Sequence, residues 1–369
     1  MVGSAMAIDL AKKHNVTITD LSDEALNKAR QKCGTLSTRQ LDVTNKPDFQ
    51  KALKSHDLVV SAVPGFLGFN TLKSIIEAGK DVVDISFFPE NALELDALAK
   101  KHNVTAIVDC GVAPGMGNII LGFHNEKMKL TDFECLVGGL PKIKKWPFCY
   151  KAPFSPIDVI EEYTRPARYV QDGKEIVREA LTDIEYVDFD KIGTLESFNS
   201  DGLRSIIHTM PHIPNMKEKT LRYPGHVEYV SVLKESGFFE TKKIDINGYM
   251  ISPLDFTSNI LFNEWRLGEN EEEFTVMRIT LKGQNRNSQH EEIIYDLYDE
   301  YDPKTNTSSM ARTTGYTATA AANLILEGMF TEKGVFPPEM VGKHEACFEF
   351  VLSYLNDRNI HYLKTTRHP

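Results

Sequence analysis

The chain has 369 residues, of which 41% are hydrophobic and 25% are charged, and its formal net charge at pH 7 is −10. These values are typical of a globular protein long enough for two domains with separate cores. The negative charge argues against a nucleic-acid partner, because phosphate binding requires a basic surface. No segment approaches the roughly 20 consecutive apolar residues that span a bilayer, so we expect no membrane association.

The cysteine pattern bears on the compartment and on metal binding. The five cysteines, at positions 33, 110, 135, 149 and 347, are scattered and include no C-x-x-C pair. This favours reduced thiols over a disulfide framework or a zinc site. His208 and His212 have i, i+4 spacing, but Pro211 between them disfavours a helix. Since the start, Met1-Val-Gly-Ser, also lacks the features of a secretory signal, we expect a cytoplasmic protein without a metal centre.

Short apolar strands alternate with helices over the first third of the chain. The expected strands cover 16–20, 39–43, 58–62, 82–85 and 104–109, and the expected helices cover 5–13, 22–33 and 47–54 and then run up to 77 and up to 99. This alternation is typical of a parallel, doubly wound α/β sheet. Ligands of such sheets bind at the carboxyl ends of the strands.

Asp20 ends its strand where a dinucleotide-binding fold places the acid that binds the adenosine ribose. The usual spacing of about 20 residues from the first fingerprint glycine makes Gly3 the third glycine of G-x-G-x-x-G. The first strand and the first two glycines are then missing. Two explanations stay open. Either the sequence is recorded from an internal methionine, which we favour because the pattern after Gly3 is intact, or the chain is a relative with an impaired site.

The segment Asp109–Asn118 follows a buried strand and contains three glycines and one proline. Glycine permits positive φ and close backbone approach, whereas proline has a fixed φ and no N–H to donate. We interpret this loop as a wall of the active site and as a hinge between two domains. An ordinary turn between strand and helix is the alternative.

From about Asp132 the pattern changes to long extended runs. Strands are expected over 133–139, 168–170, 185–189, 243–251, 274–282 and 293–298, and the last three resemble an antiparallel meander. We therefore expect an α/β protein with a Rossmann-type parallel sheet, its first strand missing, and an α+β domain with a mixed or antiparallel sheet. The nucleotide domain should cover 1–117 and 308–369, because the C-terminal helices should return to it, and the substrate domain 118–307.

Arg222 and His226 flank the Pro224-Gly225 turn and form the strongest candidate for substrate chemistry. Arginine binds a carboxylate through two parallel hydrogen bonds, and histidine is the commonest acid–base group near neutral pH. We expect Arg222 to bind the substrate carboxylate and His226 to transfer a proton, with Tyr150 lining the pocket. A surface turn with an ion pair is the alternative.

Two further polar segments are weaker candidates. Arg312 and Thr313 lie at the start of a helix rich in small residues and could face the cleft, with a plain helix cap as the alternative. Glu196 to Asp201 supply polar groups on what reads as a glycine-bounded loop. Neither segment has a ligand pattern of its own.

Five motifs in order resemble the saccharopine dehydrogenase family. They are Gly111–Met116, Val137–Pro141, Thr194–Phe198, Leu221–His226 and Met310–Tyr316. Within that family, Glu162–Ala167 and Gly334–Glu339 are most similar to lysine 6-dehydrogenases. The resemblance implies a Rossmann domain, an α+β domain and C-terminal helices that return to the Rossmann half. It also implies hydride transfer between a nicotinamide cofactor and a C–N bond of lysine or a lysine-derived amino acid.

We therefore expect an NAD(P)-dependent oxidoreductase that acts on a small amino-acid substrate and forms a homo-oligomer, a dimer. NAD is expected over NADP, because Asp20 repels a 2′-phosphate and no arginine directly follows it. The expected cofactor contacts are Gly3, Asp20, Asp42, Val63, Pro64, Cys110 and Gly111. The expected substrate contacts are Gly65, Ala113, Pro114, Gly115, Tyr150, Arg222, His226, Arg312 and Thr313. The alternatives are a saccharopine-forming or carboxy-polyamine-forming reductase, or a non-catalytic relative.

Overall fold

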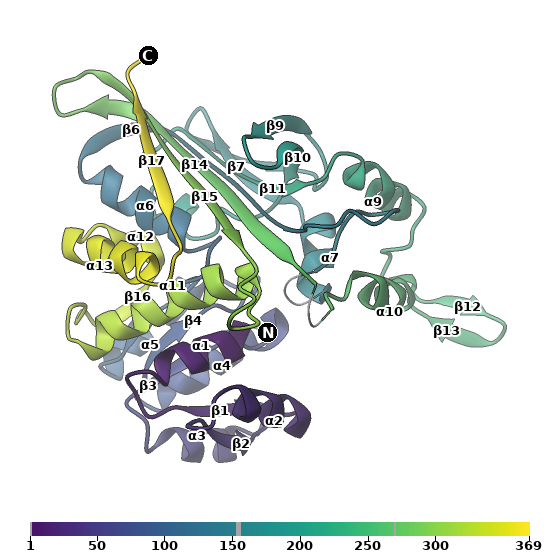
Figure 1. The fold of residues 1–369 in the computed structure, drawn as a ribbon, viewed down its shortest axis with the longest axis vertical. Coiled ribbons are helices and arrows are strands. Elements are labelled where there is room, and N and C mark those ends of the chain that lie inside the picture. Colours follow the sequence, from purple (N-terminus) through teal and green to yellow (C-terminus); the bar gives the residue numbers. More distant parts are fainter. Residues whose placement is uncertain (1, 153–155, 269–270) are drawn as a thin grey trace. The chain divides into compact units, whose positions relative to one another are not determined.

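The computed structural model describes residues 2–152, 156–268 and 271–369, and the chain divides into two compact units (Figure 1). The first unit comprises Met1–Lys127 and Met310–His361, and the second comprises Met128–Ser309 and Tyr362–Pro369. This division differs from the expected boundaries at 118–127, which join the first unit, and at 308–309 and 362–369, which join the second. Helix α6 (Met116–Asn125) belongs to the first unit because it packs on α12 (Pro338–Gly342), and strand β17 (Tyr362–Arg367) belongs to the second because it pairs with β15 (His290–Glu300).

The first unit alternates strands and helices in the expected way. Its strands are β1 (Thr17–Asp20), β2 (Ser37–Gln40), β3 (Leu58–Ser61), β4 (Asp81–Asp84), β5 (Thr105–Ile107) and β16 (Gly334–Phe336). Its helices are α1 (Val2–Leu10), α2 (Asp23–Lys32), α3 (Lys46–Leu53), α4 (Gly65–Glu77), α5 (Asp96–Lys101), α6, α11 (Ser309–Leu326), α12 and α13 (Glu345–Asn356), with a 3₁₀ turn at Ala92–Leu95. The N-terminal part, purple in Figure 1, carries β1 and β2.

The strands of the first unit form two separate parallel sheets. One sheet has the order β16-β5-β4-β3, and the other consists of β1 and β2. In the doubly wound order 3-2-1-4-5-6, β2 and β1 correspond to strands 3 and 2, and β3, β4 and β5 correspond to strands 4, 5 and 6. No strand in the described part of the chain joins β1 to β3. In keeping with this, the apolar residues Leu58, Val59 and Val60 of β3 are only half-buried. The two sheets therefore lie on either side of the position that the first strand holds in this order.

Helix α11 packs closely into the first unit because most of its side chains are small. Ala318, Ala320 and Ala322 are fully buried, and so are the hydroxyl residues Thr317 and Thr319. A threonine hydroxyl inside a protein needs a hydrogen-bond partner. That of Thr317 donates to a carbonyl one turn earlier in the same helix, at 2.8 Å.

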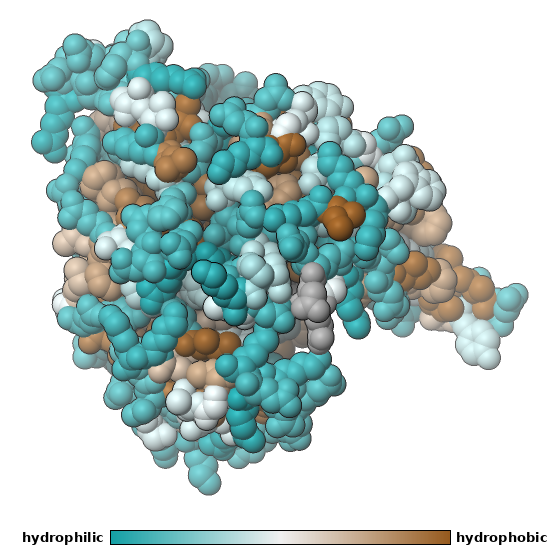
Figure 2. Space-filling view, in the orientation of Figure 1, coloured by the Kyte–Doolittle hydropathy of each residue, from teal (hydrophilic) through white to brown (hydrophobic). Residues whose placement is uncertain are grey.

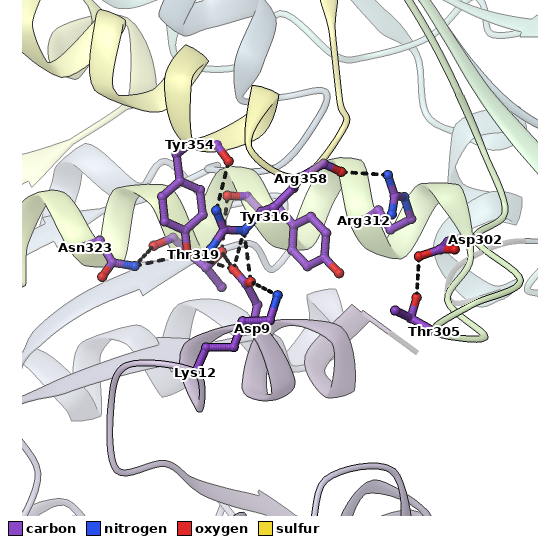
Figure 3. A network of polar contacts seen from close by, with 10 residues as sticks. All are labelled: Asp9, Lys12, Asp302, Thr305, Arg312, Tyr316, Thr319, Asn323, Tyr354 and Arg358. Atoms are coloured by element: carbon purple, nitrogen blue, oxygen red, sulfur yellow. Dashed lines mark hydrogen bonds and ion pairs between the residues drawn. The ribbon is translucent and has the colours of Figure 1, made fainter.

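A buried polar network ties α1 to α11 and α13 (Figure 3). The carboxylate of Asp9, in α1, accepts hydrogen bonds from Arg358 Nε at 2.9 Å, Tyr354 Oη at 2.7 Å and Thr319 Oγ1 at 2.8 Å. Burial alone would raise the pKa of Asp9, but the hydrogen bonds from Arg358 and Tyr354 outweigh it and lower the pKa. Asp9 is therefore a buried anion with a complete set of donors, and it holds the N-terminal helix in place.

The second unit contains one large mixed sheet and four helices. Its strands are β6 (Met128–Pro141), β7 (Ala167–Gln171), β8 (Lys174–Arg178), β9 (Glu185–Phe189), β10 (Gly193–Asn199), β11 (Asn215–Arg222), β12 (Ile244–Ile246), β13 (Tyr249–Ile251), β14 (Glu273–Asn285), β15 and β17. Its helices, within the described residues, are α7 (Pro156–Thr164), α8 (Ile206–Thr209), α9 (His226–Glu235) and α10 (Pro253–Trp265).

The main sheet has the order β17-β15-β14-β6-β11-β10-β9, with β7 and β8 attached to β11. Only β6 and β11 pair in parallel, and the other pairs are antiparallel. The expected mixed sheet is confirmed. One part of the expected meander is wrong, because 243–251 does not join β14 and β15. It forms the separate hairpin β12–β13.

Candidate functional site

The turn after β3 lies at the carboxyl edge of the parallel sheet. Helix α4 begins at Gly65, directly after Pro64, and Val63 lies between this proline and the strand. Gly65 is buried, while Pro64 is exposed. The first turn of a helix has N–H groups without partners in the helix, and these can bind polar or anionic ligand groups. The turn is therefore placed as a cofactor contact would be.

The glycines of the loop after β5 are explained by its backbone. Gly115 has φ of +141°, and a Cβ built there would lie 1.9 Å from the carbonyl oxygen of Gly111. Only glycine fits this position. The Gly111 N–H donates to the Pro114 carbonyl at 3.0 Å, and the Met116 N–H donates to the Gly111 carbonyl at 3.0 Å. The loop, with Ala113 partly exposed at its tip, is a closed turn. The alternative of an ordinary turn thus accounts for its glycine pattern.

Cys110 is a packing residue in this loop. It is 1% exposed, and burial, followed by the nearby Asp109 carboxylate, raises the pKa of its thiol to about 12. The sulfur lies 4.0 Å from the carbonyl oxygen of Thr317 in α11. An un-ionised, enclosed thiol is a poor nucleophile, so Cys110 can shape a site but not attack a substrate.

The remaining expected cofactor contacts lie on the surface of the first unit or in α1. Asp20 is exposed at the end of β1, and its carboxylate accepts the Ser22 N–H at 2.8 Å. Asp42 follows β2, and the hydroxyl and N–H of Thr44 lower its pKa by hydrogen bonding. Gly3 lies in α1, and a Cβ built there would meet no atom within 4 Å. A ligand backbone or phosphate could approach the helix closely at that point.

A buried acidic cluster that we did not predict lies where β3, β4 and β5 end. Asp84 pairs in register with Ser61, and its carboxylate accepts the N–H and hydroxyl of Ser86 at 2.9 and 3.1 Å. The Ser61 hydroxyl lies close enough to favour the Asp84 anion but makes no hydrogen bond of normal geometry. Burial raises the pKa of Asp84 to about 7, and the Asp109 carboxylate adds to this. The group is therefore partly protonated at neutral pH.

This cluster gives a pH prediction. Because the pKa of Asp84 is raised on folding, its stabilising contribution is present below its ordinary pKa and is lost as the pH rises through about 7. Asp84→Asn, neutral at every pH, should lose less thermal stability than the wild type between pH 6 and pH 8. Melting temperatures at both pH values measure this, with the exposed Asp57→Asn as control. Equal losses in wild type and Asp84→Asn would contradict the prediction.

In the second unit, Arg222 lies at the centre of a buried cluster. Its side chain is 3% exposed and forms an ion pair with Glu162, at 2.8 Å between Nη2 and Oε2. Its Nε donates to Tyr163 Oη at 3.3 Å, and its Nη1 donates to the Leu221 carbonyl at 3.0 Å. The guanidinium carbon lies 4.4 Å from the ring centre of Tyr150. The three residues expected to act on the substrate, Arg222, His226 and Tyr150, are thus brought together.

The hydrogen bonds of His226 define its tautomer. Nδ1 lies 2.9 Å from the Phe148 carbonyl, which can only accept, so Nδ1 carries the proton. Nε2 then accepts the Tyr163 hydroxyl at 2.9 Å. Burial, with Arg222 adding to it, lowers the pKa of His226 to about 3. The imidazole is therefore neutral at neutral pH, and both of its ring nitrogens are hydrogen-bonded within the protein.

Glu196 explains why two of the sequence motifs occur together. It lies in β10, opposite Arg222 of β11, and not on a loop as we expected. Its carboxylate accepts the N–H groups of Gly225 at 3.0 Å and Val227 at 2.7 Å. An acid at a helix N-terminus satisfies free N–H groups and interacts well with the helix dipole. Glu196 therefore fixes the start of α9 and, with it, the position of His226.

Two buried polar groups of the aromatic cluster around His226 lack hydrogen-bond partners in the part of the chain that the structure describes. Neither Tyr150 Oη nor Trp265 Nε1 has a hydrogen-bond partner among the described residues. Their rings lie 5.4 Å apart, and both residues are at least 96% buried. Buried polar groups without partners are uncommon in native proteins and call for an explanation. A ligand with acceptor oxygens, such as a carboxylate, would satisfy them.

Arg312 and Thr313 lie in α11, in the first unit. Arg312 Nη2 donates to the Arg358 carbonyl at 3.0 Å. Thr313 is fully buried, and its hydroxyl bonds to the Met310 carbonyl of its own helix at 3.4 Å. Both residues thus make contacts within the unit, and neither bond is that of a helix cap, whose side chain accepts a backbone N–H. Their substrate contacts stay a prediction.

The described residues contain no group of three or more His, Cys, Asp or Glu side chains placed to hold a metal ion. Within the same residues, no helix is both long and apolar enough to cross a membrane. The site residues that sequence reasoning missed are Tyr163, Glu162, Trp265 and Asp84. The motif Glu162–Ala167 pointed to the first two, but their contacts with Arg222 come from 59 and 60 residues away along the chain.

The fold and these sites define a two-unit α/β protein of the nucleotide-binding type, with a mixed-sheet unit around a buried arginine. The chain matches the family model of the saccharopine dehydrogenase NADP binding domain over residues 1–107 and that of the saccharopine dehydrogenase C-terminal domain over residues 107–360. It belongs to the saccharopine dehydrogenase family, which confirms the resemblance of the motifs.

Two curated relatives are saccharopine dehydrogenases (NADP(+), L-glutamate-forming). The one from Saccharomyces cerevisiae is 29% identical over 228 residues, 58% of this chain and 50% of the relative. The one from Pyricularia oryzae is 26% identical over 217 residues, 55% of this chain and 48% of the relative. The chain thus spans about half the length of the curated relatives it matches.

A solved structure shares the fold. It is the apo histidine-tagged saccharopine dehydrogenase (L-Glu forming) from Saccharomyces cerevisiae, with a TM-score of 0.80 and 21% sequence identity. The match covers 100% of this chain and 98% of that chain. This confirms the expected fold class.

Proposed function

We propose that this protein is an NAD(P)-dependent oxidoreductase that acts on a C–N bond of saccharopine or lysine. Its family and the printed activities of its relatives support this. The observation that carries it is the buried Arg222 over the Tyr150 ring, in a cluster where Tyr150 Oη and Trp265 Nε1 have no hydrogen-bond partner among the described residues. A cation with two further possible donors suits the carboxylate of an amino acid.

In this proposal the residues of the second unit bind and orient the substrate. Arg222 binds a carboxylate, and its partner Glu162, whose side chain is 21% exposed, gives way to it. Burial raises the pKa of Tyr163 to about 12, so its phenol keeps its proton. His226 holds that phenol in place through Nε2. His226 is then a positioning residue, and any proton transfer that depends on it runs through the Tyr163 hydroxyl.

The residues of the first unit fit a nicotinamide dinucleotide. Asp20 is an exposed acid at the end of β1, and α4 starts directly at the carboxyl end of β3. Gly3 leaves open space where a Cβ would lie. These residues would hold the ribose, the nicotinamide end and the phosphates, respectively. When bound, the cofactor supplies the hydride acceptor, which no side chain can provide.

NAD should be preferred over NADP, although the matched domain and both relatives are named for NADP. The exposed Asp20 carboxylate can accept from a ribose hydroxyl and repels a 2′-phosphate. Asp20→Ala should therefore reduce the preference, while Asp23→Ala, an exposed acid in α2, should not. Turnover at limiting NAD or NADP measures this. Equal rates with the two cofactors in the wild type would show the preference to be wrong.

The proposed function is tested by measuring the absorbance of the reduced cofactor with each candidate substrate. Reduction with saccharopine supports a saccharopine dehydrogenase, and reduction with lysine alone supports a lysine 6-dehydrogenase. Oxidation of reduced cofactor with lysine and an oxo acid supports a saccharopine-forming reductase. If none of these substrates nor a polyamine gives turnover, the non-catalytic alternative holds.

A further inference from the structure

A hairpin in the second unit extends into solvent, and its residues are exposed to it on all sides left open by the described part of the chain. Strands β12 and β13 form a two-stranded sheet that joins no other described strand, and every residue from 241 to 250 is exposed. In Figure 1 the hairpin projects from the end of α10. Isolated two-stranded hairpins are at best marginally stable in water. The hairpin therefore calls for a partner.

One face of this hairpin is entirely apolar. The pairs Ile244–Ile251 and Ile246–Tyr249 lie on the same side because side chains alternate along a strand. Ile244 is 49% exposed, Ile246 44% and Tyr249 73%. Phe256 of α10 is also exposed, and Figure 2 shows apolar side chains gathered where the hairpin leaves the unit. A clustered apolar surface of this kind marks an interaction site.

The outer edge of β12 has a defined hydrogen-bonding pattern. Asn247 and Gly248 have φ of 55° and 87°, as in a two-residue type I′ turn, so Ile246 and Tyr249 face each other as a hydrogen-bonded pair. Backbone groups alternate in direction along the strand. Lys243 and Asp245 therefore direct their N–H and C=O groups outward, away from β13. Such an edge is a template for pairing with another strand.

We propose that β12 pairs antiparallel with β12 of a second copy of this chain, about a two-fold axis at Ile244. This register places Lys243 opposite Asp245 of the other copy, and the same pair forms twice. Both residues are outward-facing, as a hydrogen-bonded pair requires, and the two Ile244 side chains meet directly. The edge is thus self-complementary in charge and in hydrogen bonding, which a two-fold interface needs.

Charge reversal tests this pairing in the full chain. The wild type should have twice the 41.7 kDa mass of one chain in light scattering after size exclusion. Asp245→Lys should shift the mass to that of one chain, because four lysines then line the edge. Adding Lys243→Asp to it should restore the dimer by exchanging the two charges. Lys242→Asp added to Asp245→Lys instead makes the same charge change as Lys243→Asp one residue away, and equally lacks the Asp245 bond from the Gly248 N–H. This matched control should stay monomeric.

A single cysteine tests the axis. Ile244→Cys should form a covalent dimer under oxidation, because the two Cβ atoms at a non-hydrogen-bonded pair are close. Ile246→Cys lies away from the axis and should not. A monomeric wild type at micromolar concentration overturns the proposal. So does a dimer that survives Asp245→Lys and forms no Ile244→Cys cross-link, or a monomer that binds lipid vesicles through the hairpin.

Discussion

Arg222→Ala is expected to lower kcat/KM by about 30-fold or more. Arg222 is a buried cation, and removing one partner of a buried charge pair costs about 2–5 kcal/mol. A loss of 2 kcal/mol corresponds to roughly 30-fold in the rate constant. Arg222→Lys keeps the charge but loses the planar fork, so it should raise KM and retain the fold. Steady-state kinetics with saccharopine and lysine measure both variants.

Arg168→Ala is the matched control for this experiment. Arg168 lies in β7 of the same unit and forms an ion pair with Asp201, at 2.9 Å between Nη2 and Oδ2. Its loss should cost stability but leave KM and kcat unchanged. If Arg222→Ala keeps wild-type kinetics, or if Arg168→Ala changes the kinetics equally, Arg222 has no role in substrate binding.

His226→Gln separates positioning from proton transfer. We expect kcat to fall by about 10²-fold with KM near its original value. Glutamine lacks the rigid ring that bonds the Phe148 carbonyl and the Tyr163 hydroxyl at once, so Tyr163 loses its fixed acceptor. The pKa of His226 is lowered to about 3, so its ionisation lies outside the range from pH 5 to 9. The shape of the kcat profile over that range should therefore match the wild type. If instead kcat of the wild type changes with pH around 6.5, and this change is absent from the variant, His226 itself is the acid–base group.

Asp9→Asn is expected to destabilise the first unit by about 3 kcal/mol or more. The change leaves Arg358, whose side chain is 15% exposed, without its buried anion, and breaking a buried ion pair costs about 3–5 kcal/mol. For a domain of 150–250 residues each kcal/mol lowers the melting temperature by about 2–4 °C. A fall of roughly 6 °C or more should appear in calorimetry. The hydroxyls of Tyr354 and Thr319 also lose the charge of the carboxylate oxygen to which both donate, which weakens these two hydrogen bonds.

Lys12→Ala is the control on the same helix. Its ammonium also contacts Asp9, at 3.1 Å, but its side chain is 60% exposed. Exposed ion pairs contribute about 0–1 kcal/mol, so the melting temperature should barely change. Similar effects of Lys12→Ala and Asp9→Asn would mean that the buried network in Figure 3 does not stabilise α1.

The amino-acid sequence by itself determined the fold class and the family. Alternation of strands and helices is a local pattern, so the parallel sheet could be predicted without knowing any tertiary contact. The motif around Arg222 and His226 was also visible, because its residues lie within five positions of one another. The spacing between Gly3 and Asp20 also identified β1 with the second strand of the doubly wound order, which agrees with its separation from β3.

Only the tertiary structure decided how the site is built. Tyr163 reaches His226 across 63 residues of chain, and Glu196 reaches the start of α9 from a neighbouring strand. The same holds for 243–251, whose alternation predicts a strand but not its neighbour. We expected it to pair in a meander, but it forms the separate hairpin β12–β13. Periodicity records which side of a strand is apolar. It carries no information on which distant strand or side chain covers it, because that depends on the packing of the whole unit.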